Sequence, residues 1–399
     1  MKKIMILGAG LWQLPAIVRA KEMGYQVIAC DMNPDSIGFQ VEGIISEVIS
    51  TLDADKLLEA AKRYQIDGVL TICADLAMRS VAYIATQMGL PGISEKAAFT
   101  ATNKAAMRAC LSEHGVPCPK YIRVVTKEEY DHAISQFVDK CVVKAVDNAG
   151  SKGIQMLNDL SNKATVDAAY DYCKQFSHSG ELVVEEFMDG PEVCVETLNI
   201  DGVCYPIQIT DQLHKQPPYF TDAGYSQPTI LPDDVQKEIH RIAIEANMAL
   251  ENYKGSSCTE IIVTKDGPKV VEVGPRLAGD CMTTHLVPLS TGVDMVTAVI
   301  NIAMGDPVDH EQKFTKGSCI RYFMKPVVGK IKEIRGLDEA RAMDGVQEVT
   351  LLKNVGDMAV ELRSSADRIA YVIAQKNTPE EAVRCCEEAL SKIEVIVEA

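Results

Sequence analysis

Two glutamates in the middle of the chain, Glu260 and Glu272, are spaced to face one another across a β-hairpin. Residues 258–264 and 268–274 each read as a strand, and a three-residue loop, 265–267, with its glycine in the left-handed conformation would join them. That register places the two carboxylates opposite each other on one face. Like charges so close destabilise a sheet unless a cation neutralises them, and carboxylate oxygens suit Mg²⁺ or Mn²⁺. A two-residue loop would instead send the glutamates to opposite faces, and the pair would have no meaning.

Two basic residues are placed to meet an anion near these carboxylates. Lys144 lies within an otherwise apolar strand, residues 141–146, and a glycine-bearing loop at 147–153 follows. Glycine lets backbone N–H groups approach phosphate oxygens, and Lys144 would add a positive charge, unless its stem only snorkels at a sheet edge. Arg276 follows the hairpin by two residues, and its guanidinium suits a phosphate or a substrate carboxylate; a surface ion pair is the alternative.

A glycine turn near the start of the chain offers a different chemistry. Gly8 and Gly10 lie between a predicted strand and a predicted helix, as in the dinucleotide fingerprint G-x-G-x-x-G, and Asp31 ends the next strand at about the distance expected for a ribose contact. Gln13 stands where the third glycine belongs. The turn therefore indicates either NAD or FAD binding, or an ordinary connection in a doubly wound sheet.

Composition narrows the classes of partner. The chain has 399 residues with 40 basic and 56 acidic side chains, so its formal net charge is −16 and it lacks a basic footprint for nucleic acid. No run reaches the roughly 20 apolar residues that span a bilayer. Its 13 cysteines, an odd number without C-x-x-C spacing, fit reduced thiols better than disulfides or a zinc site. We expect a cytoplasmic protein with no nucleic-acid or membrane partner.

The elements that must position these residues fall into three parts. Strands alternate with helices over residues 1–95, which predicts a parallel sheet. Residues 96–315 begin with a helical stretch, 96–113, and continue through a lid at about 118–187 to the hairpin. Residues 316–399 read as short strands and one helix.

Taken in order, these segments resemble the ATP-grasp family of carboxylate–amine and carboxylate–thiol ligases over nearly the whole chain. The resemblance is carried by Lys104 in N-K-A-A-M-R, the following G-V-P-C-P, Lys144, the Ser151/Gly153 loop, Glu185–Glu192, Glu260 and E-V-G-P-R from Glu272 to Arg276. It implies an α/β and α+β fold: an N-terminal Rossmann-like parallel-sheet domain, which carries no nicotinamide in this family, an ATP-grasp domain with a mobile lid, and a C-terminal subdomain.

The resemblance also implies an ATP site. Its residues are Lys104, Lys144, Ser151, Gly153, Glu185, Glu186, Met188 and Glu192. The two lysines would hold phosphates, and the loop between Asn148 and Gly153 would close over them. Backbone groups of Glu186 and Met188 would meet the adenine, and Glu192 would accept the ribose hydroxyls.

The same resemblance makes Glu260 and Glu272 ligands of two Mg²⁺ (or Mn²⁺) ions and gives Arg276, with Lys144, the catalytic role of contacting the γ-phosphate or an acyl-phosphate. Gly274 departs from the pattern, because many members have asparagine there as a further magnesium ligand. One ion would then depend more on Glu272, water and phosphate.

We predict that the chain is an ATP-dependent ligase that forms an amide, such as one between two amino acids, through an acyl-phosphate and releases ADP and phosphate. The carboxylate and the amine are its small-molecule partners, and a homodimer is expected. The irregular stretch 211–232 would line the substrate cleft. Candidate substrate residues are His214, Tyr219, Tyr225, Arg276 and His285.

Three other functions remain open at this point. One is a purine-pathway ligase of the phosphoribosylglycinamide synthetase type, although the sequence shows no dedicated phosphate pocket for it. The others are an NAD(P)-dependent oxidoreductase, which would leave Lys144 and the paired glutamates unexplained, and a nucleotide-binding module without catalysis, which Gly274 favours.

Overall fold

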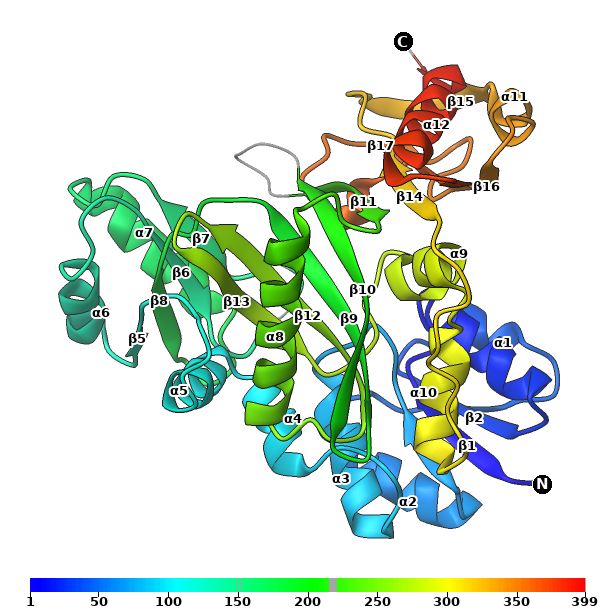
Figure 1. The fold of residues 1–399 in the computed structure, drawn as a ribbon, viewed down its shortest axis with the longest axis horizontal. Helices are drawn as coiled ribbons and strands as arrows, with labels where there is room; N and C mark the ends of the chain where they lie inside the picture. Colours follow the sequence, from blue (N-terminus) through cyan, green and yellow to red (C-terminus); the bar gives the residue numbers. More distant parts are fainter. Residues whose placement is uncertain (149, 151, 215–220, 399) are drawn as a thin grey trace.

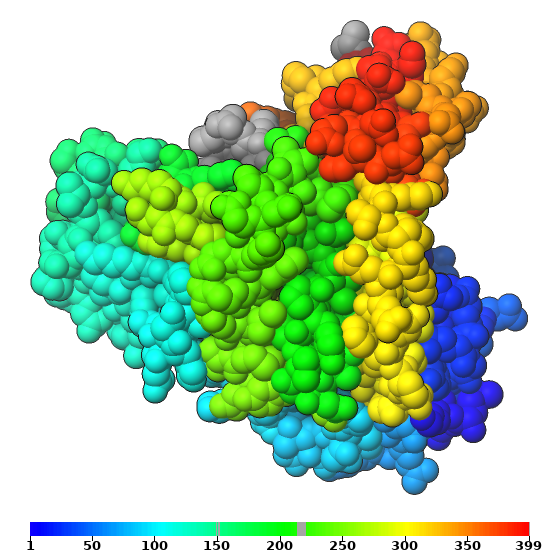
Figure 2. Space-filling model, in the orientation of Figure 1, coloured from blue at the N-terminus to red at the C-terminus, as the bar shows by residue number. Residues whose placement is uncertain are grey.

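The computed structural model describes the whole chain apart from residues 149, 151, 215–220 and 399. Three lobes are visible in Figure 1 and, as surfaces, in Figure 2: residues of the predicted lid on one side, a C-terminal lobe at the top, and an N-terminal domain beneath the central sheet. The predicted Ser151 and Tyr219 contacts lie outside the described residues.

The N-terminal domain has a four-stranded parallel sheet in the order β3-β2-β1-β4. Its elements are β1 (Lys3–Leu7), α1 (Leu14–Glu22), β2 (Gln26–Asp31), β3 (Ile45–Val48), α2 (Ala54–Tyr64), β4 (Gly68–Leu70), α3 (Ala77–Met88) and α4 (Glu95–Ala101), with a short 3₁₀ turn at Ile37–Gln40. Helices cover both sheet faces, so the central residues of β1, β2 and β4 are buried, whereas the edge strand β3 stays partly exposed. The predicted parallel α/β architecture is confirmed.

The helical stretch predicted over residues 96–113 is two helices rather than one. α4 ends at Ala101, and α5 (Lys104–Glu113) starts afresh because the side chain of Asn103 accepts a hydrogen bond from the backbone N–H of Ala106. The new start matters for the site, since it turns the first residues of α5 toward the lid and the central sheet.

An eight-stranded antiparallel sheet forms the centre of the molecule, in the order β13-β12-β9-β10-β11-β14-β18-β16. Its strands are β9 (Glu192–Ile200), β10 (Val203–His214), β11 (Asp222–Gln227), β12 (Gly255–Thr264), β13 (Gly267–Gly274), β14 (Gly317–Tyr322), β16 (Val346–Leu351) and β18 (Ala370–Lys376). α8 (Asp233–Ala249) packs its apolar side on one face, and α10 (Met295–Met304) lies between the other face and the N-terminal domain (Figure 1).

The stretch 211–232 is more regular than predicted. β10 continues to His214, and β11 pairs with both β10 and β14. The prediction of an irregular segment is therefore wrong for residues 211–214 and 222–227. Gly224 and the polar residues around it give no strand signal, because β11 pairs with a strand that is distant in the sequence.

The lid carries its own sheet, in the order β5-β8-β6-β7. Its elements are β5 (Tyr121–Val124), α6 (Lys127–Ile134), β6 (Cys141–Ala145), β7 (Ile154–Leu157), α7 (Lys163–Gln175) and β8 (Leu182–Glu186). The two helices pack on one face of this sheet around a core that includes Tyr130, Val143 and Leu182. The other face is turned toward the glutamate-bearing hairpin.

The C-terminal part extends the central sheet rather than forming a separate one. β14, β18 and β16 complete that sheet, while β15 (Gly329–Arg335), β17 (Met358–Ala359) and β19 (Glu394–Val397) make a small three-stranded sheet. η2 (Met282–Leu286) and α9 (Val287–Thr291) precede this part in the chain, and its own helical elements are α11 (Leu337–Arg341), η3 (Ser365–Asp367) and α12 (Pro379–Lys392). α12 covers β14 and β18 with a buried face that includes Cys385 and Cys386.

Two further findings concern composition. Cys194 on β9 and Cys258 on β12 form a disulfide, and the other eleven cysteines are free thiols, so the expectation of reduced thiols throughout is wrong for this pair. Their 64-residue separation conceals that they stand on neighbouring strands with Cα atoms 6.0 Å apart.

Among the described residues, no single helix has the length and apolar content to span a bilayer; only a pair bent by 112°, Met282–Thr291 with Met295–Met304, meets that criterion together.

Candidate active site

The predicted glutamate pair exists, but it is built differently from the prediction. Glu260 pairs directly with Glu272 between β12 and β13. The loop, however, pairs Thr264 with Gly267, so only two residues separate the strands, and a regular ladder would put the glutamates on opposite faces. A β-bulge corrects this: the register shifts between Glu260 and Ile261, and one extra residue, Val271, returns Glu272 to the face of Glu260.

The carboxylates differ in their surroundings. Glu272 Oε2 lies 2.8 Å from Nζ of Lys104, the first residue of α5. Burial alone would raise the pKa of Glu272, but Lys104 and the nearby Arg276 hold it below the ordinary value. For Glu260 burial raises the pKa well above its ordinary value, and the negative charges of Glu272, Glu192 and Asp222 raise it further, against the opposing pull of Arg276. The two facing carboxylates therefore differ: Lys104 and Arg276 favour the charged form of Glu272, whereas the surroundings of Glu260 disfavour its charged form.

The second predicted lysine faces the hairpin from the lid. Nζ of Lys144, on β6, lies 2.8 Å from Oε2 of Glu185 on β8, and both side chains are almost fully buried. Oε1 of Glu185 accepts a hydrogen bond of 2.6 Å from Nε of Arg108, a residue not singled out from the sequence. Burial would raise the pKa of Glu185, but Arg108 and Lys144 together lower it to about 2, so the carboxylate is ionised at neutral pH. Glu185 therefore orients Lys144.

The loop after β6 meets α5 through its backbone. Nζ of Lys104 donates to the carbonyl oxygen of Asn148 at 3.0 Å, so this lysine links the loop to Glu272. Gly153 adopts a φ of +70°, and a Cβ there would lie 2.6 Å from Cβ of Phe176. A side chain at Gly153 would thus be strained and would also collide with α7's end.

The residues predicted to form the hinge lie where the lid sheet is connected to the central sheet. The backbone N–H of Glu186 donates to the carbonyl of Lys120, and its carboxylate forms a 2.6 Å ion pair with Lys269 of β13. Met188 follows in the connection, and Glu192 begins β9, where it pairs with Ile262 of β12. Glu186 thus ends the lid strand β8, Glu192 starts the central strand β9, and Met188 lies in the connection between them.

Arg276 is held by a residue that sequence reasoning missed. Its Nε and Nη2 each lie 2.9 Å from one carboxylate oxygen of Asp75, in the loop after β4 of the N-terminal domain. Positive φ angles, which are uncommon for residues other than glycine, occur near this contact at Cys73, Asp280 and Cys281. An isolated aspartate in a β–α loop carries no sequence signal for a partner 201 residues away.

The candidate substrate residues scatter. Tyr225 is buried on β11, with its hydroxyl donating to Asp280 at 3.2 Å. The same Asp280 oxygen accepts a 2.8 Å hydrogen bond from Arg368, a fully buried residue of the C-terminal part that was also missed. His285 lies farther along, 3.4 Å from Glu348, and burial lowers its pKa. His214 ends β10, and its side chain lies outside the described part of the structure, as does Tyr219.

Residues at the glycine turn make structural contacts within the N-terminal domain. The Oε1 atom of Gln13 accepts from the backbone N–H of Ile72, and its Cγ fills the space over Gly8. Both carboxylate oxygens of Asp31 accept backbone N–H groups, from Ala9 at 2.7 Å and Asn33 at 2.9 Å. These contacts explain the presence of Gln13 and Asp31 without a dinucleotide. The residues that suggested an oxidoreductase therefore no longer support that alternative.

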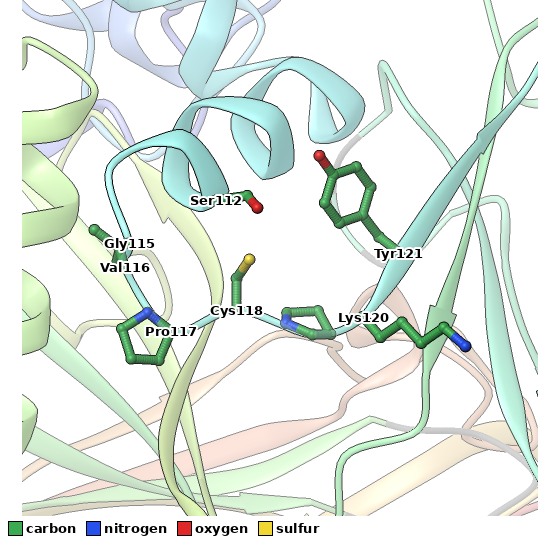
Figure 3. Close-up of a pocket in the computed structure, with 8 residues that line it drawn as sticks. Ser112, Gly115, Val116, Pro117, Cys118, Lys120 and Tyr121 are labelled. Atoms are coloured by element: carbon green, nitrogen blue, oxygen red, sulfur yellow. The ribbon is translucent and has the colours of Figure 1, made fainter.

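A pocket of about 450 Å³ opens elsewhere, where α5 ends and β5 begins. Figure 3 shows the Cys118 thiol pointing toward the hydroxyl of Ser112, with Tyr121 beside them. None of the predicted site residues lines it.

Comparison with known proteins identifies two domains to which segments of the chain are similar. Residues 101–280 match the ATP-grasp domain, and residues 321–398 match L-amino acid ligase C-terminal domain 2. The chain is 28% identical to an uncharacterised protein of Sinorhizobium fredii, over 87% of this chain and 72% of that one. It is 25% identical to the alanine–anticapsin ligase of Bacillus amyloliquefaciens, over 72% of this chain and only 64% of that protein's length.

Solved structures share the whole fold. The L-amino acid ligase from Bacillus licheniformis superposes with a TM-score of 0.86 at 20% identity, covering 100% of this chain and 99% of that one. The phosphoribosylglycinamide synthetase from Anaerococcus prevotii gives a TM-score of 0.81 at 20% identity, with both chains fully covered. At this identity the likeness establishes the fold.

Proposed function

The chain belongs to the ATP-grasp ligases, and from that premise we propose that it joins the carboxylate of one amino acid to the amine of a second compound through an acyl-phosphate. ATP and Mg²⁺ are the cofactors of such a domain. The observation that carries the proposal is the Glu260–Glu272 pair, set beside Lys104 and facing the lid that bears Lys144.

The residues present fit a divalent cation. Two carboxylates share one face, one of them has a strongly raised pKa, and hard oxygen donors of this kind suit Mg²⁺. Glu260 and Glu272 would hold this cation. We propose that two ions bind, with phosphate and water supplying the ligand that an asparagine would provide at the position of Gly274. The ion supplies charge neutralisation during phosphoryl transfer.

The protein's own groups would act as follows. Lys104 and Lys144 would bind ATP phosphates, exchanging their present carboxylate partners for phosphate oxygens. Arg276 would hold the phosphate being transferred or the substrate carboxylate, in an orientation set by Asp75. A carboxylate is a poor electrophile because its oxygen leaves badly; once phosphorylated, it can be attacked by the amine, and phosphate leaves. The lid would exclude water, which otherwise hydrolyses the intermediate.

Amino acids are proposed as substrates because the C-terminal part matches an L-amino acid ligase domain, and because an alanine ligase is among the relatives. Tyr225, Asp280 and Arg368, from three separate segments, bond to one another, and we propose that Asp280 and Arg368 would meet the two charges of an amino-acid zwitterion. Glycine joined to phosphoribosylamine is the competing reaction, and the likeness to phosphoribosylglycinamide synthetase keeps it in the screen.

The test is an ADP- and phosphate-release screen with MgATP and all pairwise combinations of the twenty amino acids, plus phosphoribosylamine with glycine. We expect release that requires both an acid and an amine, with the amide found by mass spectrometry. Glu272→Gln should bring turnover to background while the variant remains folded. Confirmed MgATP binding without turnover on any pair would instead favour a non-catalytic module, and binding of NADH but not ATP would refute the proposal.

A homodimer is also proposed as the working assembly. Light scattering after gel filtration measures this directly, and a mass near 44 kDa would contradict it.

A further inference from the structure

One buried arginine contacts both halves of the candidate site. Arg108 lies on α5, four residues after Lys104, so the two side chains leave the helix on the same side. Its side chain is completely buried. Nε donates to Oε1 of Glu185 on the lid at 2.6 Å, and Nη2 donates to the carbonyl oxygen of Val271 on β13 at 2.6 Å. The guanidinium therefore bridges two different sheets.

Val271 is the residue on which the metal-ligand geometry depends. It is the extra residue of the bulge, and without it Glu272 would fall on the face occupied by Ile261 and Val270. Val270 and Val273 both belong to the apolar core on that opposite face, although they are three residues apart. Only an inserted residue permits that spacing. A bulge leaves backbone groups outside the ladder, and Arg108 supplies the partner for the Val271 carbonyl.

Glu185 is the residue on which the orientation of Lys144 depends. Its two oxygens are divided between Arg108 and Lys144, at 2.6 Å and 2.8 Å. If Arg108 were absent, Glu185 would be free to rotate and would pair with Lys144 alone. The lysine would then be held more tightly by the protein and less available to a phosphate.

We propose that Arg108 is a positioning residue that couples the two halves of the site, keeping the bulge that sets Glu272 beside Glu260 and, at the same time, holding Glu185 so that it presents Lys144. The inference rests on the proposed function. It assigns Arg108 no contact with ATP or metal. Lysine cannot replace it, because a single ammonium cannot reach two acceptors on separate sheets as the planar guanidinium does.

The coupling predicts a double effect that neither half produces alone. In Arg108→Met, the affinity for Mn²⁺, measured by electron paramagnetic resonance of free Mn²⁺ without nucleotide, should fall about 10- to 100-fold, as is usual when a group that orients metal ligands is lost. The KM for ATP should rise about 10-fold in the same variant. Arg108→Lys should keep the charge beside Glu185 and the fold, yet still weaken Mn²⁺ binding. Glu185→Gln should change the KM for ATP and leave Mn²⁺ affinity within twofold.

Arg335→Met is the matched control, since this exposed arginine forms a surface ion pair with neighbouring Glu333 and should alter neither value. An Arg108→Met protein in which only the Mn²⁺ affinity or only the KM for ATP changes would overturn the coupling. If Arg108→Met is insoluble, Arg108→Lys decides the question. Wild-type affinity for Mn²⁺ in Arg108→Lys would show that a guanidinium donating to two acceptors is not required. Wild-type protein that binds neither Mn²⁺ nor ATP would defeat the proposed function itself, a result separate from any difference among variants.

Discussion

Replacing Glu260 with glutamine should stabilise the metal-free protein while abolishing its activity. Facing residues of an antiparallel pair have Cβ atoms roughly 5 Å apart, and two unit charges at about 5 Å with an effective dielectric constant of about 20 repel by roughly 3 kcal/mol. Lys104 offsets part of this by pairing with Glu272 at 2.8 Å. We therefore expect Glu260→Gln to gain about 1–2 kcal/mol in the free energy of unfolding above pH 8 without divalent cations.

The pH dependence has a definite sign. The pKa of Glu260 is raised in the folded protein, so the native state binds a proton more tightly than the unfolded state. The wild type should lose stability as pH rises from about 5 through that raised pKa, and Glu260→Gln should lack this loss. The advantage of the variant should therefore vanish near pH 5.

Urea denaturation at pH 5.5, 7 and 8.5, in EDTA and in 10 mM MgCl₂ with an ATP analogue, measures these effects. Ligand binding to the native state should stabilise the wild type and reverse the order. Glu59→Gln, a change at an exposed helix position, is the control for charge removal alone and should shift stability by less than about 0.5 kcal/mol. A Glu260→Gln protein less stable than wild type at pH 8.5 in EDTA would refute the electrostatic reasoning.

Two further predictions concern the partners that hold the site. Asp75→Asn leaves the buried Arg276 without its counter-ion; because the two side chains keep 16% and 13% exposure, the cost should be roughly 2–3 kcal/mol in urea denaturation, together with a lower kcat. Asp338→Asn, in a surface pair with Arg341, should cost less than about 0.5 kcal/mol, and equal losses in both would contradict the assignment. Gly153→Ala should raise the KM for ATP at least tenfold, whereas Gly150→Ala, with a similar φ of +66° but open space around its Cβ, should change it about twofold or less. Similar effects of the two alanines would show that the collision with Phe176 is unimportant.

Much of the architecture was readable from local patterns. The pattern of apolar residues predicted β6 and β13 to within one residue of their observed limits. The order of chemical groups along the chain was enough to predict the ATP-grasp fold. The type of a helix or strand depends on residues that are close together in the sequence, and the order of motifs can be read directly along the chain.

The predicted loop of the hairpin was wrong, yet the predicted pairing was right, and the reason is instructive. A two-residue loop and an inserted Val271 each shift the faces by one residue, and together they cancel. Nothing within the strand marks Val271 as the insertion. β11 escaped notice for a related reason, since its stability comes from pairing with β10 and β14.

The amino-acid sequence by itself determined which charged groups are available and in what order, because residue type sets the pKa range, the donor geometry and the helix or strand preference. Which of them meet was decided only by tertiary packing. Arg108, Asp75 and Arg368 acquire their roles from hydrogen-bond partners 77, 201 and 88 residues away, brought within reach by sheets and helices that bury apolar surface elsewhere. Burial then changes what those charges do, since a group removed from water must find a counter-charge in the protein or shift its pKa.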